Sequence, residues 1–157
     1  MAANAVSTAG MNVKWCVETT ASGTRPTTGY TIIPGCKVLP ALFNEPNALQ
    51  STPLSAKKNH TYIEGLGDSG GATAITVNDY PEFRTAWNAC VAAYAALENG
   101  KQMWFEFAYD EDTGLESFYF PGKPVALGFG GAEVDSVLEN NANIMPTGDY
   151  EFAAAST

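Results

Sequence analysis

Three carboxylates lie close together in the last third of the chain, and their spacing is that of a possible calcium loop. Asp110, Asp112 and Glu116 carry the oxygen ligands that Ca²⁺ prefers. An EF-hand also needs a ligand at its fifth position and a glycine at its sixth, and here Gly114 stands where a ligand should be. A turn between two strands explains these residues better, so we expect no metal site.

Two further features resemble parts of a catalytic site. Asp68-Ser69-Gly70-Gly71 is similar to the sequence around some serine nucleophiles, but the chain is too short for the two barrels that usually carry such a sequence. His60 is the single histidine, and no Ser, Cys or acidic partner stands in a known arrangement with it. Turn chemistry explains the glycine-rich stretch better. We therefore expect that the protein is not an enzyme.

Neither the cysteines nor the glycine-rich segments predict a cofactor. Cys16, Cys36 and Cys90 are widely spaced and form no Cys-x-x-Cys pair, so free thiols in a reducing compartment are expected. The segment 128–131 lacks the lysine and the spacing of a phosphate-binding loop.

Composition limits the class of partner. The 157 residues fit a single domain, 1–157, with a substantial core. Eight Lys and Arg stand against 17 Asp and Glu, which gives a formal net charge of −9. Such a chain should adhere neither to nucleic acid nor to an anionic membrane surface. It contains no apolar run long enough to span a bilayer, and Met1 to Gly10 does not read as a secretory signal.

One amphipathic helix is predicted over residues 81–98. Pro81 suits the first helical position and Glu82 the positive end of the helix dipole. Apolar residues then recur at spacings of three and four and line one face: Phe83, Trp87, Cys90, Val91, Tyr94 and Leu97. We expect the helix to lie on a sheet, with Phe83, Trp87, Val91 and Tyr94 in the helix–sheet core.

Most of the remaining chain predicts strands. A tight turn or bulge is expected over 61–71, where glycines are frequent. Alternating or β-branched runs predict strands at 12–18, 30–33, 37–42, 72–77, 102–108, 116–120, 125–129 and 133–139, with a resumption at 143–145. The predicted fold class is mainly β, an antiparallel β-sandwich with one flanking helix.

Three segments have no predicted regular structure. Residues 1–10 are small and polar, and we expect a flexible N-terminal arm. Residues 150–157 are mostly small, and we expect a frayed C-terminal tail. Residues 43–60 show neither helical nor strand periodicity, and they carry Lys57 and Lys58. Loops of this length are usually functional or disordered. The segment is either a solvated surface loop or an arm that orders only against a neighbouring subunit.

The order of these motifs resembles a known family. The segment Tyr62-Ile63-Glu64-Gly65-Leu66-Gly67-Asp68-Ser69-Gly70-Gly71 is followed by a strand ending at Asn78 and by the helix with Phe83 and Trp87. Three later features complete the pattern: the strand at 103–107, the strand at 116–122, and the ending from Val134 to Asp149. This arrangement is similar to the major tail (tail tube) proteins of long-tailed, non-contractile bacteriophages, the family of the phage lambda major tail protein.

The resemblance implies a structural role. Family members form six-membered rings whose subunits complete an inner β-barrel, and the rings stack into a virion tail tube assembled in the host cytoplasm. It also implies tape measure and tail terminator or tip proteins as partners. In the family the long loop reaches the adjacent ring, which assigns an inter-ring contact to Phe43, Glu45, Leu54, Lys57, Lys58 and His60. Contractile tails and secretion tubes share the architecture.

A tube of this kind must pass double-stranded DNA without holding it. Basic lumen residues would bind phosphate, whereas acidic ones repel it. Glu106, Glu116, Asp135 and Glu139 lie on predicted strands opposite apolar faces, and we expect some of them to face the lumen. The alternative function is a carbohydrate-binding β-sandwich module, because the aromatic runs 104–107 and 118–120 could form a sugar-binding strip.

Overall fold

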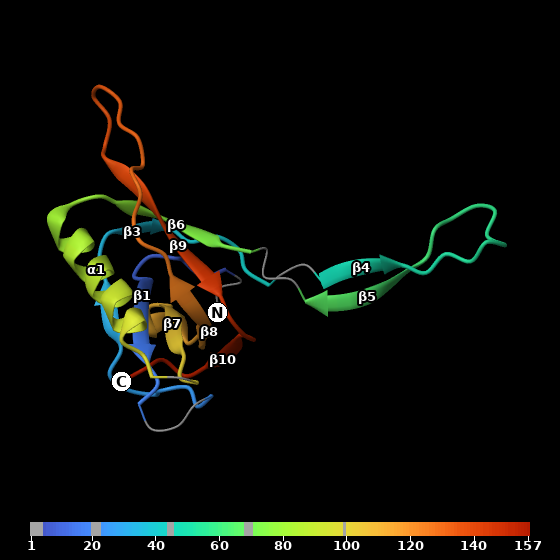
Figure 1. The fold of residues 1–157 in the computed structure, drawn as a ribbon, viewed down its shortest axis with the longest axis horizontal. Coiled ribbons are helices and arrows are strands. Elements are labelled where there is room, and N and C mark those ends of the chain that lie inside the picture. The colour runs from blue at the N-terminus through green and yellow to red at the C-terminus, as the bar shows by residue number, and fades with distance from the viewer. Residues whose placement is uncertain (1–4, 20–22, 44–45, 68–70, 99) are drawn as a thin grey trace.

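The computed structural model of the chain describes residues 5–19, 23–43, 46–67, 71–98 and 100–157 (Figure 1). Its elements, in chain order, are β1 (Asn12–Val17), β2 (Thr31–Ile33), β3 (Cys36–Val38), β4 (Pro46–Gln50), β5 (Tyr62–Gly67), β6 (Thr73–Asn78), α1 (Pro81–Ala95), β7 (Met103–Ala108), the short 3₁₀ helix η1 (Glu111–Thr113), β8 (Ser117–Pro124), β9 (Glu139–Pro146) and β10 (Glu151–Ala153).

The strands of the body form one curled antiparallel sheet. Its order is β2-β1-β7-β8-β9-β6-β3, and β10 pairs with β8 beside this path. The first part of β8 pairs with β7 and β10, whereas its last residues pair with β9, so β8 links two layers. β2 and β3 stand at opposite ends of the order, yet only Pro34 and Gly35 separate them in the sequence. The sheet must therefore curl back on itself.

Gly35 is required at this connection. Its φ is +82°, and a Cβ there would lie 2.6 Å from the ring of Tyr80. Both the backbone conformation and the close approach exclude a larger residue.

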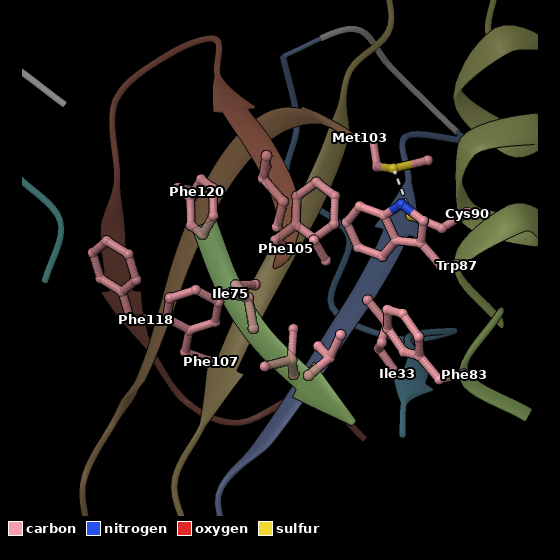
Figure 2. Close-up of a cluster of buried hydrophobic side chains, with 14 residues drawn as sticks. Ile33, Ile75, Phe83, Trp87, Cys90, Met103, Phe105, Phe107, Phe118 and Phe120 are labelled. Carbon is pink, nitrogen blue, oxygen red and sulfur yellow. Dashed lines mark hydrogen bonds between the residues drawn. The ribbon is translucent and has the colours of Figure 1, made fainter. Parts of the chain in front are cut away.

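The hydrophobic core lies between the two layers and the helix (Figure 2). Four phenylalanines from β7 and β8 pack together at its centre, with the rings of Phe105 and Phe120 stacked 5.7 Å apart. Ile75 and Ile144 come from the other layer. Phe83, Trp87 and Cys90 of α1 are fully buried against the cluster, and Val91 and Tyr94 are partly buried against it.

The helix begins where the sequence predicts and ends earlier. Pro81 is its first residue, and Asp79 just before it accepts two hydrogen bonds from the Arg84 guanidinium, at 2.6 and 2.8 Å. The indole of Trp87 donates to the carbonyl of Val125 at 2.8 Å. The α-helix ends at Ala95, not at residue 98, because the next N–H groups bond in a tighter turn, with the Leu97 N–H donating to the Tyr94 carbonyl.

The observed architecture confirms the predicted fold class, a mainly β sandwich with one flanking helix. Two predicted strands are wrong. Residues 125–129 and 133–138 form a long loop between β8 and β9, in which Val134 and Val137 are exposed. The alternation there was misleading because a strand needs a partner along its whole length. In the described chain only Val125 and Leu138, at the two ends of this segment, form backbone hydrogen bonds to other segments, with Asn143 and Asp79. β9 instead begins at Glu139, through Asn-rich sequence of low strand propensity.

Three further predictions are corrected by strand pairing. The predicted turn at 61–71 contains β5, which pairs with β4. Residues 43–60, predicted to lack regular structure, contain β4. The tail 150–157, predicted to fray, contains β10, which pairs with residues 117–119 of β8. In each case a short strand forms because a partner strand satisfies its backbone groups.

Candidate assembly surfaces

The most prominent surface feature is an arm, which we define as residues 46–67. β4 and β5 pair with each other in a two-stranded sheet of their own, separate from the sheet of the body. Figure 1 shows this hairpin projecting away from the body. At about 3.3 Å per residue, its five-residue strand β4 spans roughly 16 Å before the tip begins. The arm is therefore long enough to reach well into a neighbouring molecule.

The arm exposes apolar and cationic side chains. Leu54 at the tip is fully exposed, and Leu49, Tyr62 and Ile63 on the strands are each more than half exposed. Lys57 and Lys58 are also exposed on the tip. Large apolar side chains on an otherwise solvated hairpin mark an interaction surface rather than a core.

The predicted inter-ring residues do not all lie on the arm. Leu54, Lys57, Lys58 and His60 do, and the Gln50 amide lies 2.8 Å from Nδ1 of His60 across the hairpin. Phe43 does not: its ring packs 5.0 Å from that of Tyr150, so it belongs to the body. The assignment of Phe43 to the long loop missed this, because Phe43 is held in place by Tyr150, far away in the sequence. Glu45 lies outside the described residues.

The predicted lumen carboxylates occupy four different environments. Glu106 is fully buried, so its expected position on an open face is wrong. Glu116 is exposed just before β8. Asp135 is exposed in the β8–β9 loop with a φ of +56°, not on a strand. Glu139 begins β9 and forms an ion pair with Lys37 at the surface.

Glu106 is the centre of a buried polar cluster that the sequence did not predict. Its carboxylate accepts hydrogen bonds from the Tyr119 hydroxyl at 2.9 Å, the Ser156 N–H at 3.1 Å and the Ser156 hydroxyl at 2.6 Å. The Tyr119 hydroxyl also lies 2.7 Å from the carbonyl of Ala154. The C-terminal segment thus covers Glu106 and supplies its donors.

The same cluster extends to the loop after β1. Arg25 forms an ion pair with Glu151 of β10, and its guanidinium lies 4.1 Å above the ring centre of Tyr119. This stacking orients the cation over the negative face of the ring. Arg25 therefore links the loop to the C-terminal strand.

The cluster shifts the pKa values of its members. Burial opposes ionisation of Glu106, but the hydrogen bonds led by that of the Ser156 hydroxyl outweigh it and lower the pKa of the carboxyl group. Burial, together with the hydrogen bond to Glu106, raises the pKa of Tyr119. The carboxylate is therefore charged and the phenol neutral at neutral pH, so the phenol can donate.

In the described part of the chain, no group of three or more His, Cys, Asp or Glu side chains is placed to hold a metal. In the same residues, no helix is long and apolar enough to cross a membrane.

The fold has a counterpart in a phage-derived particle. No family model matches the sequence, and no curated protein matches it. The structure is similar to a chain of the anti-feeding prophage baseplate, seen in its six-fold symmetrised cryo-EM structure. The similarity covers 100% of both chains, with a TM-score of 0.62 and 12% sequence identity. At this level of identity, the similarity shows a shared fold. The fold class of this chain is a curled β-sandwich with a flanking helix and a projecting arm.

Proposed function

We propose that the protein is a structural subunit of a bacteriophage tail tube, with no catalytic role. Six copies form a ring, and stacked rings form a hollow conduit for double-stranded DNA. The observation that carries the proposal is the arm: a hairpin with exposed apolar side chains that projects from a fold also found in a six-fold symmetrised phage-derived assembly.

The arm makes best sense in an assembly. An isolated two-stranded hairpin is marginally stable in water, and this one leaves Leu49 and Ile63 more than half exposed. Burial of such side chains against another copy would stabilise both the hairpin and the contact, at about 25 cal/mol per Å² of apolar area. The arm therefore suits a contact between rings.

The sheet edges support the inner barrel that neighbouring subunits would complete. β2 and β3 stand at the two ends of the strand order of the body. Ile32 and Val38 on these edges are 51% and 56% exposed. Exposed edges with apolar side chains invite strand pairing with another chain, and ring closure would cover them.

The charge of the chain suits passage of DNA. A net charge of −9 disfavours phosphate binding, so an acidic lumen would repel the DNA backbone and leave it free to slide. Among the predicted lumen carboxylates, exposed Glu116 and Asp135 and half-exposed Glu139 stay candidates, whereas Glu106 does not. The family resemblance also suggests partners and a place of assembly, and both are part of the proposal. The partners are a tape measure protein and tail terminator or tip proteins, and the tail is assembled in the host cytoplasm.

The carbohydrate-binding alternative has less support. The aromatic runs that suggested a sugar-binding strip are buried: Phe105 and Phe120 lie in the core, and Trp104 donates to Glu18 at 2.9 Å. A sugar-binding strip needs aromatic faces open to solvent.

Negative-stain electron microscopy of the purified protein across a concentration and salt series tests the proposal. We expect rings, or tubes with a regular axial repeat, and light scattering that rises with concentration. A chain that stays monomeric at all concentrations, with its arm protected from proteolysis, would contradict a tube-forming role, because the arm would then be a rigid part of a monomer.

A further inference from the structure

A second element projects from the body, the β8–β9 loop, which we define as residues 125–138. Two hydrogen bonds hold its first residues: the Trp87 indole donates to the Val125 carbonyl, and the Asn140 amide donates to the Gly128 carbonyl at 2.8 Å. Its other end is held by the Asp79 N–H, which donates to the Leu138 carbonyl at 3.0 Å. The loop is therefore anchored at both ends while its middle stands out in solvent (Figure 1).

The middle of this loop is apolar and acidic. Phe129, Val134 and Val137 are 83%, 92% and 67% exposed. Its charged residues are Glu133 and Asp135, both exposed, and in the described part of the chain neither has an ion-pair partner. Free carboxylates beside exposed apolar side chains describe a surface that suits a cationic, apolar partner.

The tip of the arm has the complementary chemistry. Residues 51–61 carry Lys57 and Lys58 and no acidic residue, and Leu54 between the strands is fully exposed. Among the described residues, the two lysines likewise have no ion-pair partner. The same chain thus presents two surfaces that match in charge and in apolar character.

These two surfaces lie at opposite ends of one strand pair. β6 follows the arm and β9 follows the β8–β9 loop, and the two strands are antiparallel, with Thr73 opposite Ile144 and Asn78 opposite Glu139. The arm therefore leaves one end of this pair and the loop leaves the other, and Figure 1 shows them pointing away from each other. They cannot meet within one molecule but can meet between two.

We propose that the β8–β9 loop of one copy receives the arm tip of the next copy, with Lys57 and Lys58 facing Glu133 and Asp135 and with Leu54 near Phe129. This inference rests on the proposed tube and names its inter-ring contact, and it removes Asp135 from the lumen candidates, which leaves Glu116 and Glu139. Because the two surfaces differ, the contact is head-to-tail, and a head-to-tail contact that does not close extends into a stack.

The other exposed acidic turn is a poorer receiver. η1 carries Glu111 and Asp112 and comes just before the first residues of β8. The last residues of β8 pair with the last residues of β9, so the first residues of β8 extend beyond the C-terminal end of β9. η1 thus lies at the end of the sheet from which the arm itself leaves. Copies that stack along the strand direction bring the arm to the loop and not to η1, so η1 serves as the matched control.

Charge reversal in the full chain tests the contact. K57E/K58E gives a molecule whose arm and loop are both acidic, and E133K/D135K gives one in which both are cationic. We expect each variant alone to need at least about tenfold more protein for half-maximal association, measured by sedimentation velocity, because like charges then meet. An equimolar mixture should associate nearly as well as wild type, because each arm then finds a loop of opposite charge.

Three results would overturn the inference. One is an E133K/D135K variant that associates like wild type. A second is a mixture that associates no better than its components. The third is a control variant, E111K/D112K, that by itself loses association as strongly as E133K/D135K does, because η1 takes no part in the proposed contact. In each of these results wild-type tubes still form and the proposed function stands, whereas wild-type protein that never associates and whose arm is protected from proteolysis would overturn both.

Discussion

At the scale of single residues, Glu106 is the best-defined chemical feature of the molecule. A fully buried carboxylate is unfavourable unless it is paired or hydrogen-bonded, and here three donors satisfy it. Two of these donors belong to Ser156, close to the C-terminus. The charge of Glu106 therefore fixes the C-terminal segment to the body.

We expect E106Q to lower the free energy of unfolding by about 1–3 kcal/mol at pH 7, because an amide cannot accept all the donors that point at the carboxylate. Urea denaturation measures the change. The matched control is E116Q, at an exposed position, which should change the free energy of unfolding by less than about 0.5 kcal/mol.

The pH dependence of this difference follows from the lowered pKa of Glu106. A carboxyl group whose pKa is lower in the folded than in the unfolded state stabilises the fold above its unfolded pKa, and that stabilisation is lost as the pH falls through the folded pKa. The difference between wild type and E106Q should therefore shrink as the pH falls below about 4.5, the ordinary value for this group. A difference that stays constant to low pH would show that Glu106 is not stabilised as an anion.

At the scale of elements, the arm and the body are structurally separate. β4 and β5 form their own sheet, and the core cluster contains no described residue of the arm. Pro46 and Gly67 pair at the base of the hairpin, so the chain enters and leaves the arm at nearly the same point. The body should therefore fold without the arm.

Replacement of residues 46–67 by Gly-Gly tests this separation. We expect the free energy of unfolding to change by less than about 1 kcal/mol, because the buried core keeps its contacts. We also expect electron microscopy to show no tubes, because the inter-ring contact is gone. Thermal unfolding and near-UV circular dichroism check the first part. A body that fails to fold would show that the arm contributes to the core, and tubes that persist would remove the arm from the contact.

At the scale of the whole molecule, two electrostatic effects oppose each other. Each subunit carries a net charge of −9, so subunits repel one another at long range. The proposed contact between the arm tip and the β8–β9 loop is attractive at short range. Salt screens the long-range repulsion at lower concentrations than the short-range attraction, because the Debye length is about 10 Å at 0.1 M and about 3 Å at 1 M.

Association should therefore pass through a maximum with ionic strength. We expect it to rise up to roughly 0.1–0.2 M salt, as long-range repulsion is screened, and to fall towards 1 M, as the close charge pairs weaken. Light scattering at fixed protein concentration measures this. K57E/K58E, which lacks the attractive pairs, should instead show association that only rises with salt. A wild-type curve of the same shape as that of the variant would contradict the charge-pair contact.

The sequence by itself determined the features that local patterns encode. The 3.6-residue spacing of Phe83 and Trp87 predicts the helix and its buried face, and the alternation of Met103, Phe105 and Phe107 predicts a core strand. The acidic composition, read from the sequence alone, predicts which partners the chain avoids. These properties depend on the residue itself or on neighbours within a few positions, so they can be predicted from the sequence.

Only the tertiary structure decided which distant segments meet. Residues 151–153 form a strand because β8 leaves a free edge there, and Glu106 is buried because the C-terminal segment folds over it. Residues 133–138 alternate as a strand would, yet among the described residues only the last of them, Leu138, has a backbone partner, the Asp79 N–H. Pairing and burial depend on partners far apart in sequence, and local periodicity carries no information about those partners.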